Sequence, residues 1–302
     1  MGSRFQQAIG TRFRRIITAD SSGVPPWLSE ISSGADHGLF RPTDAPWIIH
    51  ADLSTLIGGI RALLMQALHP GSLSGVATHS RYETDPLGRL AGTTKWLTIL
   101  TFGGQQAIAR ESDRVNQMHE RVRGKYQSAT GVEVSYQAKD ADLLQWVHIA
   151  FTDSFLRTFQ LYSPSRELPI ADEYVSKWAQ AVTYLGLPSG PQSEEELVAT
   201  LNSYLENNQL AVTDQTKRVL KFIRRPPLSK VALVVYGVLF QAALVSIPQP
   251  YKSMLGMKCW PKQIVIPLAR ILMRLMKLAI GSHSPLEEAA LARLQEIGAI
   301  TA

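Results

Sequence analysis

The spacing of hydrophobic residues along the chain predicts helices over most of its length. Residues 142–162 show it best, because an apolar side chain recurs there every four positions, at Leu143, Val147, Phe151, Phe155 and Phe159. The same helical spacing marks residues 52–68, 93–102, 105–123, 170–185, 194–208, 214–224, 229–247, 263–280 and 285–297. The sequence has no series of alternating strands and no fixed repeat. The pattern therefore predicts an all-α fold in a single multi-helix domain.

The stretches without this spacing predict one terminal arm and the connections. Residues 1–45 are basic at first and then rich in Gly, Pro and Ser, which indicates an irregular N-terminal arm before a helical domain at 46–302. Pro70 ends the first long helix, because proline disfavours helical geometry in the residue before it. Residues 72–92 are expected to form a structured connection between helices, and the polar residues 125–139 a loop.

One apolar stretch raises the question of a membrane span. Val231–Ile247 carries no charge, but it has 17 residues and contains Gln241. A spanning helix needs about 20 apolar residues. A helix that is apolar all round also suits the centre of a large helical domain. We therefore expect a buried core helix here, in preference to a membrane span.

The segment at 263–280 predicts an amphipathic helix. One side collects Ile264, Leu268, Ile271, Leu275 and Leu278, and the opposite side collects Arg270, Arg274 and Lys277. This pattern is typical of a surface helix docked on a core, which is the favoured interpretation. It is also typical of a helix lying in a membrane interface, and that alternative stays open.

Composition limits the chemistry that the chain can carry. The chain has 302 residues, of which 45% are hydrophobic and 19% charged, as in an ordinary globular protein. Cys259 is the single cysteine, so an internal disulfide and the usual Cys-based zinc and iron–sulfur sites are excluded. An unpaired thiol suits a reducing compartment, and we expect a cytoplasmic location. The basic N-terminus lacks the apolar core of a signal peptide.

The net charge of +6 is modest, and no nucleic-acid-binding motif accompanies it. We therefore expect no nucleic-acid partner. The sequence also lacks the nucleophile elbow, the phosphate-binding loop, the dinucleotide fingerprint and the His-Glu-x-x-His zinc motif. The common hydrolase, nucleotide-triphosphatase and dehydrogenase interpretations lose their usual support.

Among the seven histidines, His148 stands out, because it lies on the apolar side of the 142–162 helix. A buried imidazole needs a partner, since an unsatisfied polar group costs about 1–3 kcal/mol. A core histidine bonded to protein is the commoner case, and a metal ligand is the alternative. A metal triad of His69, His79 and His119 is conceivable, but its spacing matches no established motif.

The helix at 105–123 brings Arg114 and Met118 to one face, with Arg121 on the same side. A guanidinium binds carboxylates in a bidentate manner, so this face could serve a pocket that receives an acidic ligand. A basic face exposed to solvent explains the same pattern equally well.

Three blocks, in this order, resemble the MpaB-like oxygenase family, which shares its catalytic domain with the rubber oxygenases or latex clearing proteins. The blocks read RALLMQALHPGSLSGVATHSRYETDPLGRL, LTFGGQQAIARESDRVNQMHERVRG and DLLQWVHIAFTDSFL, within residues 45–250. The resemblance implies an all-helical domain with a buried pocket for haem b, held by a proximal histidine that matches His148. Because the sequence has no Cys-x-x-Cys-His, the haem would be bound non-covalently.

The resemblance also has limits. Arg114 matches an arginine that lies near the haem in rubber oxygenases, whereas Met118 falls where those enzymes have a threonine. Their distal lysine and acidic base have no counterpart here. The haem scaffold and the oxygenase chemistry are therefore carried over, and cleavage of polyisoprene is not.

We therefore expect a haem-dependent oxygenase that uses dioxygen or peroxide on a small or medium apolar substrate. His148 would ligate the iron, Arg114 would bind a propionate or polarise bound oxygen, and Met118 would line the cofactor site. His79 and His119 are further catalytic candidates. Two alternatives stay open: a non-catalytic haem-binding or haem-sensing protein with a second internal ligand (His69, His79, His119 or Met118), and a cofactor-free helical protein that contacts membranes weakly.

Overall fold

The computed structural model describes residues 25–79, 86–281 and 283–301. The predicted fold class is confirmed, because helices dominate these residues and their only sheet is one two-stranded hairpin. Contacts group the chain into two compact units, each assembled from segments distant in sequence. Unit 1 comprises Met1–Ala51, Arg81–Gln117 and Arg274–Ala302, and unit 2 comprises Asp52–Ser80 and Met118–Met273.

The core of unit 1 lies between short helices and the longer helices that they pack against. It contains α2 (Leu28–Ser32), α3 (Ala45–Ala51), α6 (Pro86–Phe102), most of α7 (Gln105–Arg121) and α16 (Pro285–Glu296). Trp47 and Phe102 stack edge to face, with ring centroids 4.8 Å apart. Trp27 and Ile31 are also buried, within the segment predicted to be an irregular arm. That prediction is wrong for residues 28–32, because the apolar side chains of α2 are anchored in the core.

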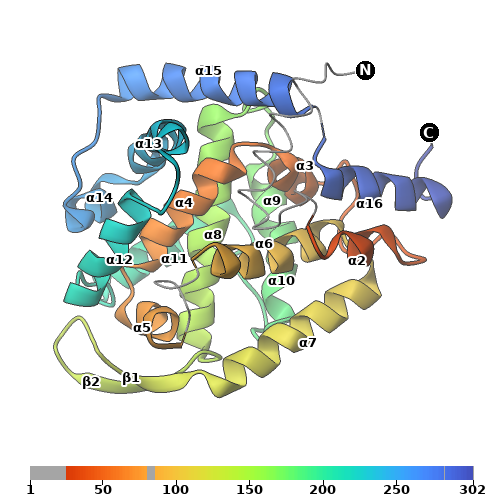
Figure 1. Ribbon diagram of the computed structural model, residues 1–302. Coiled ribbons are helices and arrows are strands. Elements are labelled where there is room, and N and C mark those ends of the chain that lie inside the picture. The colour runs from red at the N-terminus through yellow and green to blue at the C-terminus, as the bar shows by residue number, and fades with distance from the viewer. Residues whose placement is uncertain (1–24, 80–85, 282, 302) are drawn as a thin grey trace. The chain divides into compact units, whose positions relative to one another are not determined.

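Unit 2 is built around α8 (Ala141–Tyr162), which packs against α4 (Thr55–Gln66) and α13 (Lys230–Ser246) (Figure 1). Gly58 allows the close approach of α4, since a Cβ there would lie 2.6 Å from Cδ1 of Phe155. The remaining helices of the unit are α5 (Pro70–His79), α9 (Ala171–Trp178), α10 (Gln180–Thr183), α11 (Glu194–Glu206), α12 (Asp214–Arg224), α14 (Gln249–Leu255) and the start of α15 (Lys262–Ile280).

Two predicted connections have regular structure. The segment expected to link helices at 72–92 belongs largely to α5 and α6, and each of these begins with a proline. Proline suits the first helical turn, where its missing N–H has no intrahelical partner to lose, so it starts these helices. The predicted loop at 125–139 is an antiparallel hairpin of β1 (Arg123–Gln127) and β2 (Glu133–Gln137). Its strands are short and mostly exposed, and therefore carry little hydrophobic alternation.

The apolar helix α13 is buried in only part of its length. Its buried residues all lie in the second half, from Leu239 to Leu244. Val231 and Val234 are 79% and 72% exposed, so the expectation of a buried core helix is wrong for the first turns and confirmed for the second half. Among the described residues, no single helix is long and apolar enough to cross a membrane, although Ala45–Ala51 and Thr55–Gln66 together meet that criterion as a bent pair.

Candidate active site in the helical core

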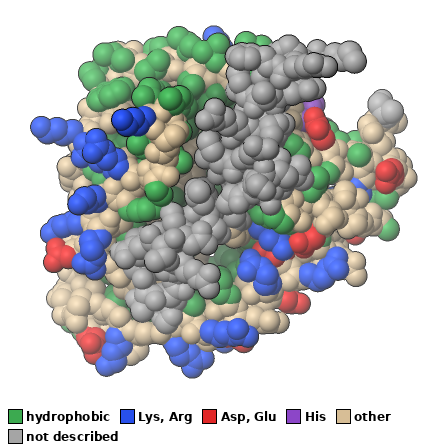
Figure 2. All heavy atoms as spheres, in the orientation of Figure 1, with side chains coloured by type: hydrophobic (Ala, Val, Ile, Leu, Met, Phe, Trp, Pro, Cys, Tyr) green, Lys and Arg blue, Asp and Glu red, His purple; other side chains and the backbone are tan. Residues whose placement is uncertain are grey.

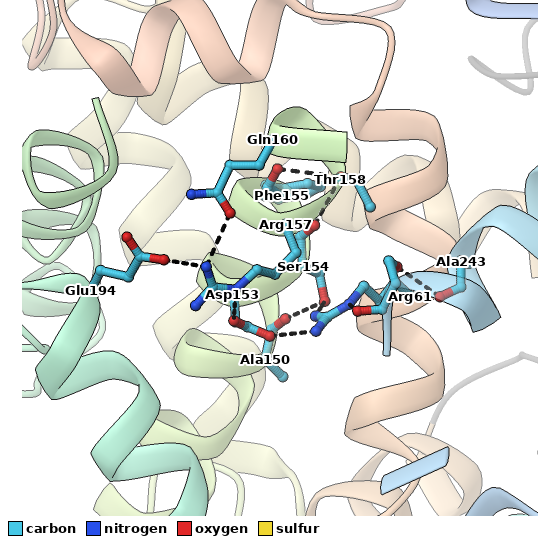
Figure 3. Close-up of polar contacts among 11 residues, drawn as sticks. Arg61, Ala150, Asp153, Ser154, Phe155, Arg157, Thr158, Gln160, Glu194 and Ala243 are labelled. Atoms are coloured by element: carbon cyan, nitrogen blue, oxygen red, sulfur yellow. Dashed lines mark hydrogen bonds and ion pairs between the residues drawn. The ribbon is translucent and has the colours of Figure 1, made fainter. Parts of the chain in front are cut away.

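A charged cluster occupies the contact between α4 and α8 (Figure 3). Arg61 of α4 is fully buried and donates from Nη2 to Oδ2 of Asp153 at 2.5 Å and from Nη1 to Oγ of Ser154 at 2.8 Å. The other carboxylate oxygen of Asp153 accepts from Nε of Arg157 at 3.0 Å, and Arg157 also pairs with Glu194 of α11. Each buried charge thus has a partner, which buried ions require. The cluster fixes α8 against α4.

His148 lies on α8, five residues before Asp153, and its environment is very different. Its side chain is 7% exposed, and none of the described residues provides a hydrogen-bond partner for Nε2. Burial lowers the pKa of His148 to about 4, so the imidazole is neutral near pH 7. The ring therefore presents an unpaired nitrogen inside the protein, and such groups call for an explanation.

The backbone of Gly190 stands against the free edge of this ring. A Cβ at position 190 would lie 2.7 Å from Nε2 and 3.1 Å from Cδ2 of His148. Only glycine lets the chain come this close. A small apolar cluster of Leu144, Val182 and Leu187 packs in the same unit, and Leu144 lies one helical turn before the histidine. Burial of the ring disfavours the charged form of His148.

His69 is also buried in unit 2, but both of its ring nitrogens are engaged. Nε2 lies 3.2 Å from Oδ2 of Asp142, and Nδ1 accepts the backbone N–H of Ser72 at 3.3 Å. Burial acts to raise the pKa of Asp142, yet its contact with His69 helps to hold that pKa below the usual value. The imidazole is surrounded by the rings of Tyr126, Trp146 and Tyr204. With both nitrogens bonded, His69 has no lone pair left for a metal.

Arg114, predicted to bind a carboxylate, already holds one. Its Nε and Nη2 donate to the two carboxylate oxygens of Glu111, at 2.8 and 2.5 Å. Glu111 is buried and also lies 3.3 Å from Nζ of Lys95. The carboxylate contact raises the pKa of Arg114, which keeps the guanidinium charged. Glu111 is a residue that the sequence reasoning missed.

The remaining candidates lie on α5 and α7. One turn after Arg114, Met118 is largely exposed, whereas the Nδ1 atom of His119 is buried with no partner among the described residues. Burial lowers the pKa of His119. His79 ends α5, and its side chain lies outside the described residues. Within the described part of the chain, no three His, Cys, Asp or Glu residues group to hold a metal. The conceivable triad of His69, His79 and His119 includes the undescribed side chain of His79, and it stays a prediction.

Arg61 and Asp153 were also missed by the sequence reasoning, although a signal was present. Arg61 interrupts an otherwise apolar helical run, IGGIRALLMQAL, and Asp153 interrupts IAFTDSFL. A charge in such a run must find an opposite charge if the helix is buried. Two such interruptions on two buried helices indicate a pair, but not which residues form it.

The sequence of this mainly helical chain matches the model of an oxygenase catalytic domain. The family model described as "ER-bound oxygenase mpaB/B'/Rubber oxygenase, catalytic domain" matches residues 47–278. The chain therefore belongs to this family, as the resemblance of the three blocks predicted. It is an oxygenase and hence an oxidoreductase, with an organic substrate and dioxygen as its partners. No curated protein and no solved structure matches the chain.

Proposed function

We propose that the chain binds haem b non-covalently through His148 and uses it to oxidise a small or medium apolar substrate. The observation that carries the proposal is the buried, neutral imidazole with an unpaired Nε2, in a chain that belongs to an oxygenase family. A neutral imidazole is the usual proximal ligand of haem iron in several haem protein classes. The other described histidine at the heart of unit 2, His69, has no free nitrogen to compete.

His148 would hold the haem iron through its neutral imidazole, and binding would first require movement of the backbone at Gly190. The Gly190 backbone lies against Nε2, so coordination at this atom requires the contact to open. Because position 190 has no side chain, the segment can withdraw without also moving a Cβ past the ring. Haem, when bound, supplies the activation of dioxygen or peroxide for transfer of oxygen to the substrate.

The other residues of the chain then have supporting roles. Paired charges at Arg61 and Asp153 hold α8, and with it His148, in place. The family resemblance assigns Arg114 to a haem propionate, and within its own unit Arg114 already donates from Nε and Nη2 to Glu111. Neutral His119 is assigned to proton handling. His79 stays a catalytic candidate on the family resemblance, and its side chain lies outside the described residues. Met118 is assigned to the haem edge, where a thioether packs readily on an aromatic ring.

The test is haem retention by the purified full chain. After reconstitution with haemin and desalting, the wild type should show a Soret band and about one haem per chain. His148→Ala should lose most of the bound haem while its far-ultraviolet circular dichroism stays helical. The matched control is His37→Ala, because His37 is exposed.

Equal haem content and an unchanged Soret band in His148→Ala would overturn the assignment of the ligand. A wild type that stays colourless after reconstitution would overturn the haem proposal as a whole. A haem-loaded wild type that consumes no oxygen with any apolar substrate, and has a six-coordinate spectrum, would favour the non-catalytic haem-binding alternative.

A further inference from the structure

Helix α15 docks on the protein through a different face from the one expected. Its buried residues are Val265, Ala269, Met273 and Met276. The stripe predicted to dock lies beside the buried face and is exposed along the whole helix: Ile264, Leu268, Ile271, Leu275 and Leu278. The favoured interpretation of this stripe as a docking face is therefore wrong. The helix has two apolar faces, and only one of them is covered.

More exposed apolar side chains lie on α13 and in the segment before α15. Val231 and Val234 are exposed on the first turns of α13, and Trp260, two residues before α15, is 50% exposed. The backbone N–H of Trp260 donates to the Gln241 side chain at 2.9 Å, which ties this segment to α13. Figure 2 shows hydrophobic side chains gathered over α13 and the beginning of α15, with Lys and Arg beside them.

The charge of this part of the chain is unusually one-sided. Between Asp214 and Glu287 the sequence contains twelve Lys and Arg residues and no Asp or Glu. The rest of the chain is therefore net acidic, since the total is only +6. Most of these cations are exposed, including Lys230, Lys258 and Lys262 next to the apolar side chains.

We propose that this apolar–basic surface, formed by the exposed residues of α13, of the Lys262–Met273 part of α15 and of Trp260, docks the protein on an anionic lipid membrane. Apolar side chains flanked by Lys and Arg, with a Trp at the edge, are what binds in a lipid interface. The cytoplasmic leaflet carries anionic lipid, which matches both the charge and the proposed cytoplasmic location.

A second copy of the chain is the competing occupant, and the charge argues against it. A two-fold interface places the same patch on both partners, so the cations of one copy would face those of the other. A membrane of opposite charge removes this repulsion. The proposal does not depend on haem, so either can fail without the other.

The experiment is flotation of the full-length protein with vesicles of phosphatidylcholine alone or with one-third phosphatidylglycerol. We expect about tenfold more binding to the anionic vesicles at low salt, and a loss of most of it in high salt. Ile264→Ser combined with Ile271→Ser should reduce binding about fivefold or more, because it removes apolar contact but no charge. The matched control is Val132→Ser combined with Leu168→Ser, since both are exposed but lie outside the surface. It should bind as the wild type does.

Trp260 provides a second measurement. Brominated lipid should quench part of the tryptophan fluorescence in the wild type, and this part should disappear in Trp260→Phe. The proposal is overturned if anionic vesicles bind no protein at low salt, or if the Ile264 and Ile271 variant binds as well as the wild type. It is also overturned if the wild type forms a dimer that this variant abolishes, while neither binds vesicles.

Discussion

His69 and His148 are buried to a similar degree in the same unit, yet only one of them is satisfied. His69 bonds through both nitrogens, to Asp142 and to a backbone N–H. His148 is left with Nε2 unpaired, facing the backbone of Gly190. Burial of a histidine therefore says little about its role. The difference lies in what the neighbouring elements offer, and a nitrogen left unpaired is the one that remains for a ligand.

In the Arg61–Asp153 pair both buried charges have a partner. Removing one of the two should have the largest effect on stability. Asp153→Ala leaves a buried guanidinium without its carboxylate, which should lower the free energy of unfolding by about 3–5 kcal/mol. Urea denaturation followed by circular dichroism measures this loss. The control is Arg61→Met combined with Asp153→Leu, in which both charges are gone and much of the stability should return. A single variant as stable as the wild type would contradict a structural role for the pair.

The next largest loss of stability should come from lowering the pH, because His148 is buried in its neutral form. Its pKa of about 4 in the folded protein lies below the ordinary value of 6.5. Between these two pH values the unfolded chain binds a proton that the folded chain does not, so stability falls as the pH falls. The loss contributed by this group should approach about 3 kcal/mol at pH 4, and the contribution is fully present above pH 6.5.

The measurement is the urea midpoint between pH 7 and pH 4 in the protein without haem. His148→Leu should lose less stability over this range than the wild type does. His50 serves as an internal comparison, because burial lowers its pKa to about 3 and its contribution stays in both proteins. Identical pH profiles for the variant and the wild type would refute the assignment of a buried neutral His148.

Some elements of the fold could be predicted from the sequence, and others could not. The helices at 142–162 and 214–224 were predictable, because their apolar residues repeat at helical spacing whatever their partners are. The short helices α2 and α14 and the hairpin were not, because their few residues gain their stability from contacts with distant segments. In the same way, the sequence showed that His148 would be buried, but not that Gly190, 42 positions later, would stand against it.

Gly190 provides the next test, with a smaller effect. Gly190→Ala places a methyl group where it would contact Nε2, and overpacking of this kind costs about 1–3 kcal/mol. The same methyl should reduce haem retention after reconstitution. Gly59→Ala is the control, because nothing lies within 4 Å of a Cβ there and alanine favours a helix. Its thermal midpoint should be equal or higher, and its haem content unchanged. Gly190→Ala with wild-type stability and haem content would mean that the contact is unimportant.

The smallest expected change in stability is also the most informative. Leucine should destabilise the protein at position 69 but not at position 148. Replacing His69 by leucine strips Asp142 of its buried partner, so His69→Leu should be destabilising by about 1–2 kcal/mol at pH 7. Replacing His148 by leucine removes an unpaired polar atom and adds apolar volume of similar size, so His148→Leu should be neutral or slightly stabilising without haem. Both are measured as urea midpoints of the protein without haem, and a destabilised His148→Leu would show that its imidazole has a bonding partner after all.

Haem should reverse which of the two variants is the more stable. Ligand binding stabilises only the state that binds, so haemin should raise the thermal midpoint of His69→Leu and leave that of His148→Leu unchanged.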